Sequence, residues 1–157
     1  MNKEFINNFI SAARDELGTP WHHQGRAART GIDCIGLLVL SAKKAGAEIK
    51  DCVQYKLRSN NGLMLLNNLR SNLIEVPWGQ YQIGDVIPFW YRKKGVAQHI
   101  GIITKDCPVW FIHSFLRSLN PEASYVKEEP LKHFWIKRIL KSDDREEPMF
   151  FRFKEAF

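Results

Sequence analysis

Residues 33–46, DCIGLLVLSAKKAG, form the segment around which the rest of the chain can be placed. Asp33 is of a residue type that caps helix N-termini, an apolar run follows it, and two lysines precede Gly46. This order predicts a buried helix whose charges suit the helix dipole. Cys34 then lies in the first turn, where the positive end of the dipole lowers a cysteine pKa from about 8.5 toward roughly 3.5–7.5.

Two roles are open for Cys34. The first turn of a helix has backbone N–H groups without helical partners, which can hold a developing oxyanion beside a nucleophilic sulfur. The alternative is a small buried core cysteine, the commoner case for a cysteine taken at random. The glycine-rich loop before Cys34 and the apolar helix after it favour the nucleophile, and Gly36 is expected to leave the approach to the first turn of the helix uncrowded.

The segments around this helix predict an α+β fold. Apolar residues recur at helical spacing over 5–17, and Gly18-Thr19-Pro20 ends that helix. Residues 21–32 lack periodicity and predict a loop, while a third helix is expected from about Asn60–Asn61 through Leu69. After Pro77, short segments rich in branched and aromatic residues predict an antiparallel sheet, with strands at 85–90, 99–104, 109–114, 125–127, 135–140 and, as an edge strand, 149–153.

Length and composition exclude several classes of protein. A chain of 157 residues without a linker predicts one domain over 1–157, and 45% hydrophobic with 25% charged residues is typical of soluble globular proteins. No apolar run approaches the roughly 18 residues of a membrane span, so no membrane insertion is expected. The charged N-terminus is unlike a signal peptide, so the chain is expected to stay in the cytoplasm unless another route exports it. The net charge of +6 is spread without a nucleic-acid-binding signature, so no nucleic acid is expected as a partner.

The cysteines and histidines limit which disulfide, metal and cofactor sites the chain can form. Cys34, Cys52 and Cys107 are odd in number and include no CxxC pair, which argues against a disulfide framework and a structural zinc site. No metal or organic cofactor is predicted. His22 and His23 lie in the predicted loop and are expected to face solvent.

Residues 99–114, HIGIITKDCPVWFIHS, predict a β-hairpin that carries a histidine on each strand. With a three-residue loop at 105–107, His99 lies directly opposite His113, with Cβ atoms roughly 4.5–5.5 Å apart. Such a pair is the base and the orienting half of a catalytic triad. A four-residue loop would turn His113 to the other face, and satisfied polar residues at strand ends are the alternative reading. Zinc held by Cys34 and both histidines is a further alternative, but the close-spaced ligand motif of hydrolytic zinc sites is missing.

Four ordered blocks between Phe9 and His113 resemble the NlpC-type cell-wall peptidases. Residues 17–39, LGTPWHHQGRAARTGIDCIGLLV, are similar to the family motif in which Gly-Thr-Pro-Tyr leads through a glycine-rich loop to Asp-Cys-Ser-Gly-Leu on a helix. Residues 83–90 (IGDVIPFW), 98–104 (QHIGIIT) and 111–114 (FIHS) resemble the strands that follow. The order, with the cysteine before the two strand residues, is that of the unpermuted branch of the family. The motif GTPW resembles most the proteins of phage tails and gene-transfer particles.

This resemblance implies a papain-like fold, with N-terminal helices packed on a central antiparallel sheet of about five or six strands. It implies Cys34 as nucleophile, His99 as general base and His113 as orienter of a cysteine peptidase or amidase. The substrate would be a peptidoglycan stem peptide, cleaved next to D-glutamate through an acyl-enzyme. Phage-tail or secretion-machinery proteins are the implied partners, and either would deliver the chain to the periplasm or cell wall.

Four positions are expected to contact substrate, and three of them depart from the family pattern. Trp21 stands where tyrosine is usual, Ile35 replaces a serine and leaves backbone donors for the oxyanion, and Gln98 replaces the serine before the histidine. Asp33 either pairs with a substrate amine or caps its helix, and capping is favoured. The departures keep two alternatives open: an inactive tail-assembly or wall-binding module, and a deamidase or other acyl-transfer effector with the same triad.

Overall fold

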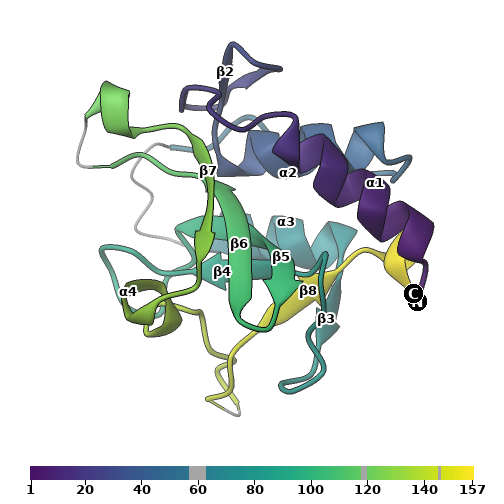
Figure 1. Cartoon of the computed structure of the whole chain (residues 1–157). Helices are drawn as coiled ribbons and strands as arrows, with labels where there is room; N and C mark the ends of the chain where they lie inside the picture. Colours follow the sequence, from purple (N-terminus) through teal and green to yellow (C-terminus); the bar gives the residue numbers. More distant parts are fainter. Residues whose placement is uncertain (57–62, 118–119, 145) are drawn as a thin grey trace.

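The computed structural model describes the whole chain except residues 57–62, 118–119 and 145. In the described part, six antiparallel strands form one sheet in the order β3-β8-β4-β5-β6-β7, and four α-helices pack around it (Figure 1). This confirms the predicted α+β fold. The helices are α1 (Lys3–Arg14), α2 (Cys34–Lys44), α3 (Leu63–Asn72) and α4 (His133–Ile136), and the sheet strands are β3 (Ile74–Val76), β4 (Val86–Phe89), β5 (His99–Asp106), β6 (Val109–Ser114), β7 (Val126–Pro130) and β8 (Phe150–Arg152). The 3₁₀ turns η1 (Pro121–Ala123) and η2 (Lys154–Ala156) complete it.

One face of the sheet is covered by the N-terminal helices. The buried faces of α1 and α2 pack against alternate residues of the central strands, Ile100 and Ile102 among them. Phe9 of α1 is fully buried and meets the Phe153 ring edge-on at 5.2 Å. Burial of this apolar face, worth about 25 cal/mol for each Å² removed from water, holds the helices on the sheet.

The α1 helix is shorter at its C-terminus than the predicted segment. Asn2 caps α1, and Gly18 adopts the positive φ of +84° that a helix stop favours. The α1 helix ends at Arg14, before Leu17, because the chain makes one tight turn there and leaves Leu17 exposed. No helix in the described residues combines the length and the apolar character needed to cross a bilayer.

An aromatic cluster covers the other face of the sheet. The α4 turn buries Trp135 against Phe89 and Phe111, whose ring centroids lie 5.0 and 5.9 Å from it. The predicted strand at 135–140 is therefore wrong. After α4 the chain makes a single bridge to β4, Phe89 to Ile139. A longer ladder is blocked because Pro88, on that edge of β4, has no N–H to donate.

Three other predictions need correction. Residues 149–153 do not form an edge strand, since β8 pairs with β4 on one side and β3 on the other. The predicted loop at 21–32 contains a small antiparallel ribbon, β1 (Arg26–Ala27) and β2 (Gly31–Ile32). The helix α3 begins at Leu63 in the structure, and its predicted start at Asn60–Asn61 lies outside the described residues.

The β5–β6 hairpin differs from the prediction in its register. The turn has two residues, with Asp106 paired to Val109, so the predicted three-residue loop is wrong. A β-bulge at Thr104 then shifts the pairing, and Ile103 lies opposite Phe111. His113 consequently lies opposite Gly101. His99, two residues before Gly101, is the diagonal neighbour of His113 on the same face of the sheet. Without the bulge, the short turn would place the two histidines on opposite faces.

A buried ion pair joins the residue before β4 to β8. The Asp85 carboxylate is fully buried and accepts hydrogen bonds from Arg152 Nε at 2.7 Å and from its Nη2 at 2.8 Å. It also accepts the Gln82 N–H at 2.8 Å. Burial raises the pKa of Asp85, and these donors oppose that rise. The carboxylate is tolerated in the core because the bidentate arginine and the backbone donor satisfy it.

Candidate active site

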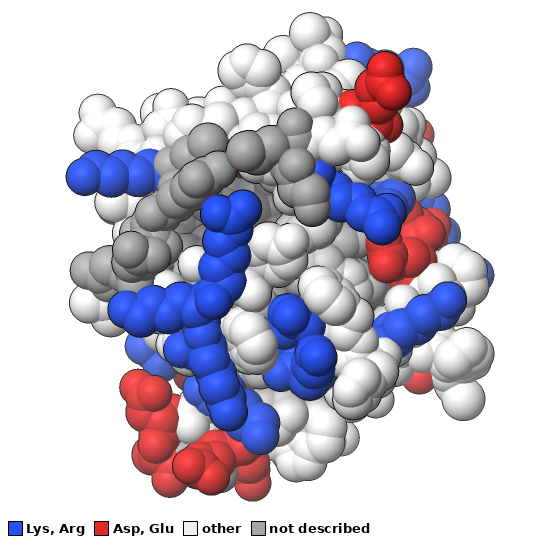
Figure 2. Space-filling model, turned by 90° about the vertical axis from the view of Figure 1, so that its left-hand side faces the viewer, with Lys and Arg blue, Asp and Glu red and all other residues white. Residues whose placement is uncertain are grey.

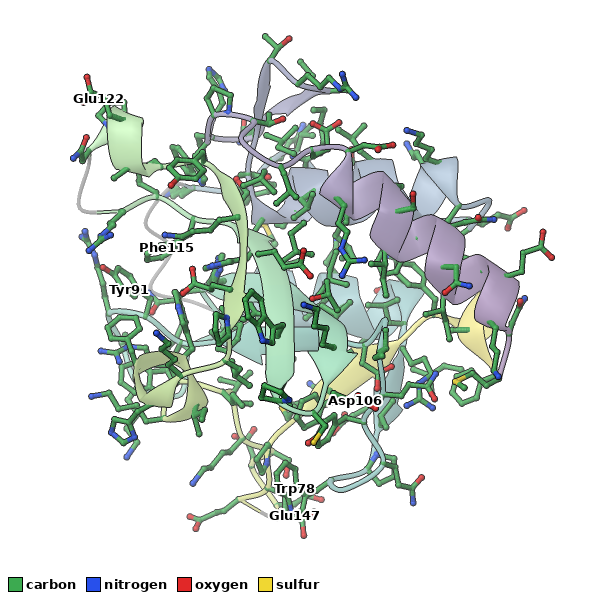
Figure 3. The ribbon with its side chains drawn as sticks, in the orientation of Figure 1. Trp78, Tyr91, Asp106, Phe115, Glu122 and Glu147 are labelled. Atoms are coloured by element: carbon green, nitrogen blue, oxygen red, sulfur yellow. The ribbon has the colours of Figure 1, made fainter. Side chains whose placement is uncertain are left out.

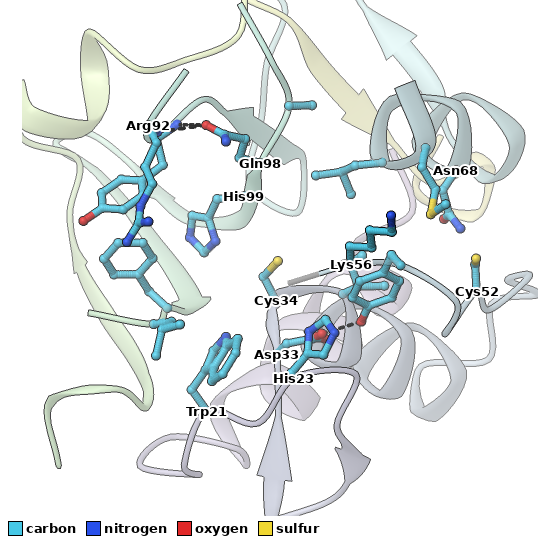
Figure 4. Close-up of a pocket in the computed structure, with 18 of the residues that line it drawn as sticks. Trp21, His23, Asp33, Cys34, Cys52, Lys56, Asn68, Arg92, Gln98 and His99 are labelled. Atoms are coloured by element: carbon cyan, nitrogen blue, oxygen red, sulfur yellow. Dashed lines mark hydrogen bonds between the residues drawn. The ribbon is translucent and has the colours of Figure 1, made fainter. Parts of the chain in front are cut away.

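A cavity of about 610 Å³ opens beside the N-terminus of α2 (Figure 4). The Cys34 sulfur and the His99 imidazole both line it, so the structure places the predicted nucleophile and base in the same cavity. His113 is fully buried and does not line the cavity. The other lining residues are Trp21, His23, Asp33, Ile35, Cys52, Gln54, Tyr55, Lys56, Met64, Leu65, Asn68, Tyr91, Arg92, Ala97, Gln98, Phe115 and Leu116.

The two histidines form a hydrogen-bonded relay that continues to a carboxylate. His99 Nε2 lies 2.8 Å from His113 Nδ1, and His113 Nε2 lies 3.1 Å from a Glu129 oxygen. An ionised carboxylate only accepts, so His113 Nε2 carries a proton and its Nδ1 is an acceptor. His99 Nε2 must then donate to it. This leaves His99 Nδ1 with a free lone pair, which is the state a general base requires.

The imidazoles sit in the aromatic cluster. The His113 ring lies 4.3 Å from the Phe111 ring, and the His99 ring lies 5.2 Å from Trp135 and 5.1 Å from Phe115. Burial lowers the pKa of His99 well below its ordinary value, and His113 lowers it further. Burial also lowers the pKa of His113, although Glu129 opposes this. Both rings are therefore neutral at neutral pH.

The Cys34 thiol is less acidic than expected for a helix N-terminus. Burial, followed by the neighbouring Asp33 carboxylate, raises the pKa of Cys34 to about 12. The backbone N–H groups of Ile35 and Ile100 act in the opposite direction but are outweighed. The predicted lowering of this pKa is therefore wrong for the resting site. A neutral thiol and a neutral imidazole share the cavity, and the thiol proton must move as the sulfur attacks.

This neutral pair predicts slow alkylation of Cys34 by iodoacetamide at neutral pH. With a pKa of about 12, the thiolate fraction rises roughly tenfold for each pH unit between pH 7 and 10, whereas an ordinary cysteine of pKa about 8.5 levels off above pH 9. Mass spectrometry of the peptides that contain Cys34 and exposed Cys107 gives both rates in one sample. A Cys34 rate that already levels off below pH 7 would show a preformed thiolate instead.

Asp33 is committed to contacts within the chain. Its carboxylate caps α2 by accepting the Gly36 N–H at 2.8 Å, as predicted, and it accepts the Gln24 N–H at 2.9 Å. Arg26 contacts it at 3.0 Å, and the Tyr55 hydroxyl donates to it. Burial and Asp33 together raise the pKa of Tyr55, which keeps that hydroxyl protonated.

Arg26 connects this cap to the segment that forms one wall of the cavity. Its guanidinium also binds both oxygens of Asp51, at 3.1 and 3.0 Å, and the Tyr55 hydroxyl at 3.1 Å. Burial lowers the pKa of Arg26, but these partners outweigh burial and raise it overall. The chain around Asp51 and Tyr55 is thus tied to the turn that carries Cys34.

Gly36 leaves room at the first turn of α2 for another part of the chain. A Cβ at this position would collide with the Gly25 carbonyl oxygen, so the glycine permits a close approach of the loop to α2.

The remaining predicted substrate contacts lie in or at the cavity. Trp21 lines it and stacks with His23 at 6.3 Å. His23, which was predicted to face solvent, therefore borders the cavity. Ile35 lines it beside the sulfur. Gln98 lines it as well, but its side-chain oxygen accepts the N–H groups of Tyr91, Arg92 and Lys93 at 2.9, 2.8 and 3.0 Å. Gln98 therefore organises the adjacent loop.

Two residues of the site were absent from the sequence predictions. Glu129 was missed because the predicted strand ended at Lys127, two residues too early. Had the strand been continued, the alternation of its side chains would have placed Glu129 beside the strand that carries His113. Tyr55 lies in a segment without regular structure, and no local pattern points to it. Among the described residues, no group of three or more His, Cys, Asp or Glu side chains is placed to hold a metal ion.

Comparisons with known proteins identify the fold. No family model matches the sequence, and no curated protein does. Among solved structures, a lipoprotein-like NLP/P60 family protein of Staphylococcus aureus superposes with a TM-score of 0.66 at 17% identity, over 98% of this chain and 42% of that one. The chain therefore spans less than half the length of that relative.

Two proteins of Mycobacterium tuberculosis extend the comparison. The peptidoglycan hydrolase RipB gives a TM-score of 0.60 at 15% identity, covering 96% of this chain and 65% of RipB. RipD, a non-catalytic NlpC/p60 domain protein adapted to peptidoglycan binding, gives 0.55 at 12% identity, covering 94% of this chain and 96% of RipD. The chain described here has the NlpC/P60 fold.

Proposed function

We propose that the protein is a cysteine hydrolase that cleaves an amide bond in peptidoglycan stem peptides. The observation that carries the proposal is the relay from Glu129 through His113 to His99, which leaves a basic nitrogen in the same cavity as Cys34. A thiol and a base with a fixed tautomer are the parts that nucleophilic acyl transfer requires.

The reaction follows from the protonation states. As the Cys34 sulfur attacks the acyl carbon, its proton passes to His99 Nδ1, and the positive charge is stabilised through His113 and Glu129. The Cys34 N–H, in the first turn of α2, is the backbone donor proposed for the developing oxyanion, because the Gly36 N–H already binds Asp33. Collapse breaks the C–N bond, His99 protonates the leaving amine, and a thioester remains. Water then releases the acyl group as a carboxylic acid and restores the thiol.

The substrate class rests on two supports of different kinds. The motif blocks around Cys34 and His99 resemble those of NlpC-type peptidases, which cleave between D-glutamate and a diamino acid. RipB, which shares the fold, is a peptidoglycan hydrolase. Delivery by a phage tail or a secretion apparatus is part of the same proposal and is motivated by the GTPW sequence of the loop before Cys34.

Purified stem peptides of different composition provide the test. The wild-type protein is incubated with tri- and tetrapeptides that contain γ-D-glutamyl bonds, and mass spectrometry identifies the fragments. We expect one new amine and one new carboxylic acid per turnover, together with a transient protein adduct of the acyl mass on the tryptic peptide that contains Cys34. A panel left intact, without any adduct, would contradict the proposal.

A non-catalytic wall-binding function is the second candidate, and one observation favours it. The pKa of Cys34, about 12, leaves the resting thiol un-ionised, and RipD shows that this fold supports peptidoglycan binding without catalysis. Binding of the peptide panel to the wild-type protein with no fragment and no adduct is the result that this candidate predicts.

A further inference from the structure

The charges that line the cavity are unbalanced. Asp33 is the one acidic lining residue in the described part of the chain, and Arg26 and the helix cap occupy it. Lys56 and Arg92 also line the cavity, and neither has a carboxylate within ion-pair distance among the described residues. The cavity therefore presents unpaired positive charge, which favours an anionic ligand.

The face around the cavity has the same character. Tyr91 and Phe115 lie on the left of the molecule in Figure 3. Figure 2 shows the molecule from that side, with Lys and Arg side chains gathered around a hollow and the acidic side chains mostly toward the periphery. A basic face of this kind raises the local concentration of anionic substrates and their rate of association.

The backbone of Arg92 is held firmly at the edge of the cavity. The Gln98 side-chain oxygen accepts three successive N–H groups there, including that of Arg92 at 2.8 Å. The neighbouring Tyr91 ring packs edge-on against Phe115 at 4.9 Å and stacks with Trp135 at 6.4 Å. The root of the side chain is thus fixed, while its guanidinium has no acidic partner in the described residues. The side chain is therefore anchored at its base, and its charge is available to a ligand.

The position of Arg92 relative to the relay indicates which part of a substrate it meets. In Figure 4 the Arg92 side chain lies on the same side of Cys34 as His99, whereas Lys56 lies on the other side. In the proposed reaction His99 must reach the leaving nitrogen, so the residue that carries this nitrogen occupies the His99 side. Building on that proposed function, we propose that Arg92 forms a subsite for a carboxylate on the residue whose amine leaves.

This subsite sets a substrate preference. A guanidinium can bind a carboxylate through two parallel hydrogen bonds, which a neutral amide cannot match and an ammonium group opposes. A leaving residue of the diaminopimelate type, which adds a carboxylate to its second amine, is therefore favoured over lysine. Because Arg92 is solvent-exposed, the preference is expected to weaken as salt is raised.

The turnover test uses two peptides that differ in one feature. Both are L-alanyl-γ-D-glutamyl-diaminopimelate, with the diaminopimelate carboxylates either free or converted to primary amides. We expect kcat/KM to favour the free acid by about tenfold, and Arg92→Ala to remove that preference. Lys94→Ala is the matched control: it removes one charge from the same exposed loop outside the cavity lining and should keep the preference. If Arg92→Ala and Lys94→Ala show the same preference for the free acid, the subsite is overturned, whereas the proposed hydrolase activity still stands.

A binding measurement separates this inference from the proposed reaction. Calorimetric titration of Cys34→Ala with the same two peptides should give about tenfold tighter binding of the free acid, and Arg92→Ala on that background should abolish the difference. If this preference is found but the wild-type protein cleaves neither peptide, the hydrolase proposal fails and the subsite stands. If Cys34→Ala binds both peptides equally, the subsite is overturned whatever the turnover result.

Discussion

Cys34→Ala is expected to lower kcat on a stem peptide by on the order of 10⁵-fold without unfolding the protein. The sulfur is the atom that forms the thioester, and an alanine methyl group cannot replace it. His99, His113 and Glu129 act as one unit with the sulfur, so removing His99 as well should add little to the loss. Initial rates by chromatography of the released amine, together with circular dichroism of each variant, provide the measurement.

The chain offers a matched control for this experiment. Cys107 lies exposed in the hairpin turn and does not line the cavity, so Cys107→Ala removes a thiol of the same size without touching the reaction. We expect its rate to equal that of the wild type. Cleavage by Cys34→Ala at more than about a hundredth of the wild-type rate would assign the reaction to another group, because removal of a triad nucleophile costs far more.

Arg152→Ala is expected to reduce the free energy of unfolding by about 3–5 kcal/mol. In the wild type the fully buried Asp85 carboxylate accepts three hydrogen bonds, and the substitution leaves it with one described donor, the Gln82 N–H. Urea unfolding followed by tryptophan fluorescence measures the effect. Arg70→Ala, which removes an exposed pair with Glu75 at 4.0 Å, is the control and should cost less than about 1 kcal/mol.

Two further measurements identify the cause of this loss. Loss of the arginine raises the folded-state pKa of Asp85 further above its unfolded value, so the protonated, stable form dominates at low pH. The destabilisation of Arg152→Ala should therefore shrink from pH 7 to pH 5. Replacing Asp85 and Arg152 together by apolar residues should cost less than Arg152→Ala alone. A loss that is independent of pH would mean that packing, and not the unpaired carboxylate, is responsible.

Local signals in the sequence located the helices α1 and α2. Asp33 and Gly18 act through hydrogen bonds and backbone angles within a few residues, so their effects on α2 and α1 can be read without knowledge of the tertiary structure. The strands were located less reliably. Residues 135–140 have the composition of a strand, but burial of Trp135 in the aromatic cluster and the missing N–H of Pro88 depend on contacts distant in sequence.

The candidate site shows the same division. Cys34 and the two histidines could be proposed from helix position and strand alternation. Glu129 and Tyr55 come into the site from other segments of the chain, and a one-dimensional pattern does not bring them together. The acidity of the thiol was mispredicted because the helix dipole is a local effect, whereas burial and the Asp33 charge, which dominate, depend on the folded surroundings.

The bulge at Thr104 constrains how this protein can change in length during evolution. An indel of one residue in the turn between Ile103 and Trp110 would send the second imidazole to the helix-covered side of the sheet. Homologous chains that keep the relay should therefore differ here by even numbers of residues, or exchange the bulge for a longer turn. A single-residue gap at this place in an alignment would mark a lineage that has given up the relay.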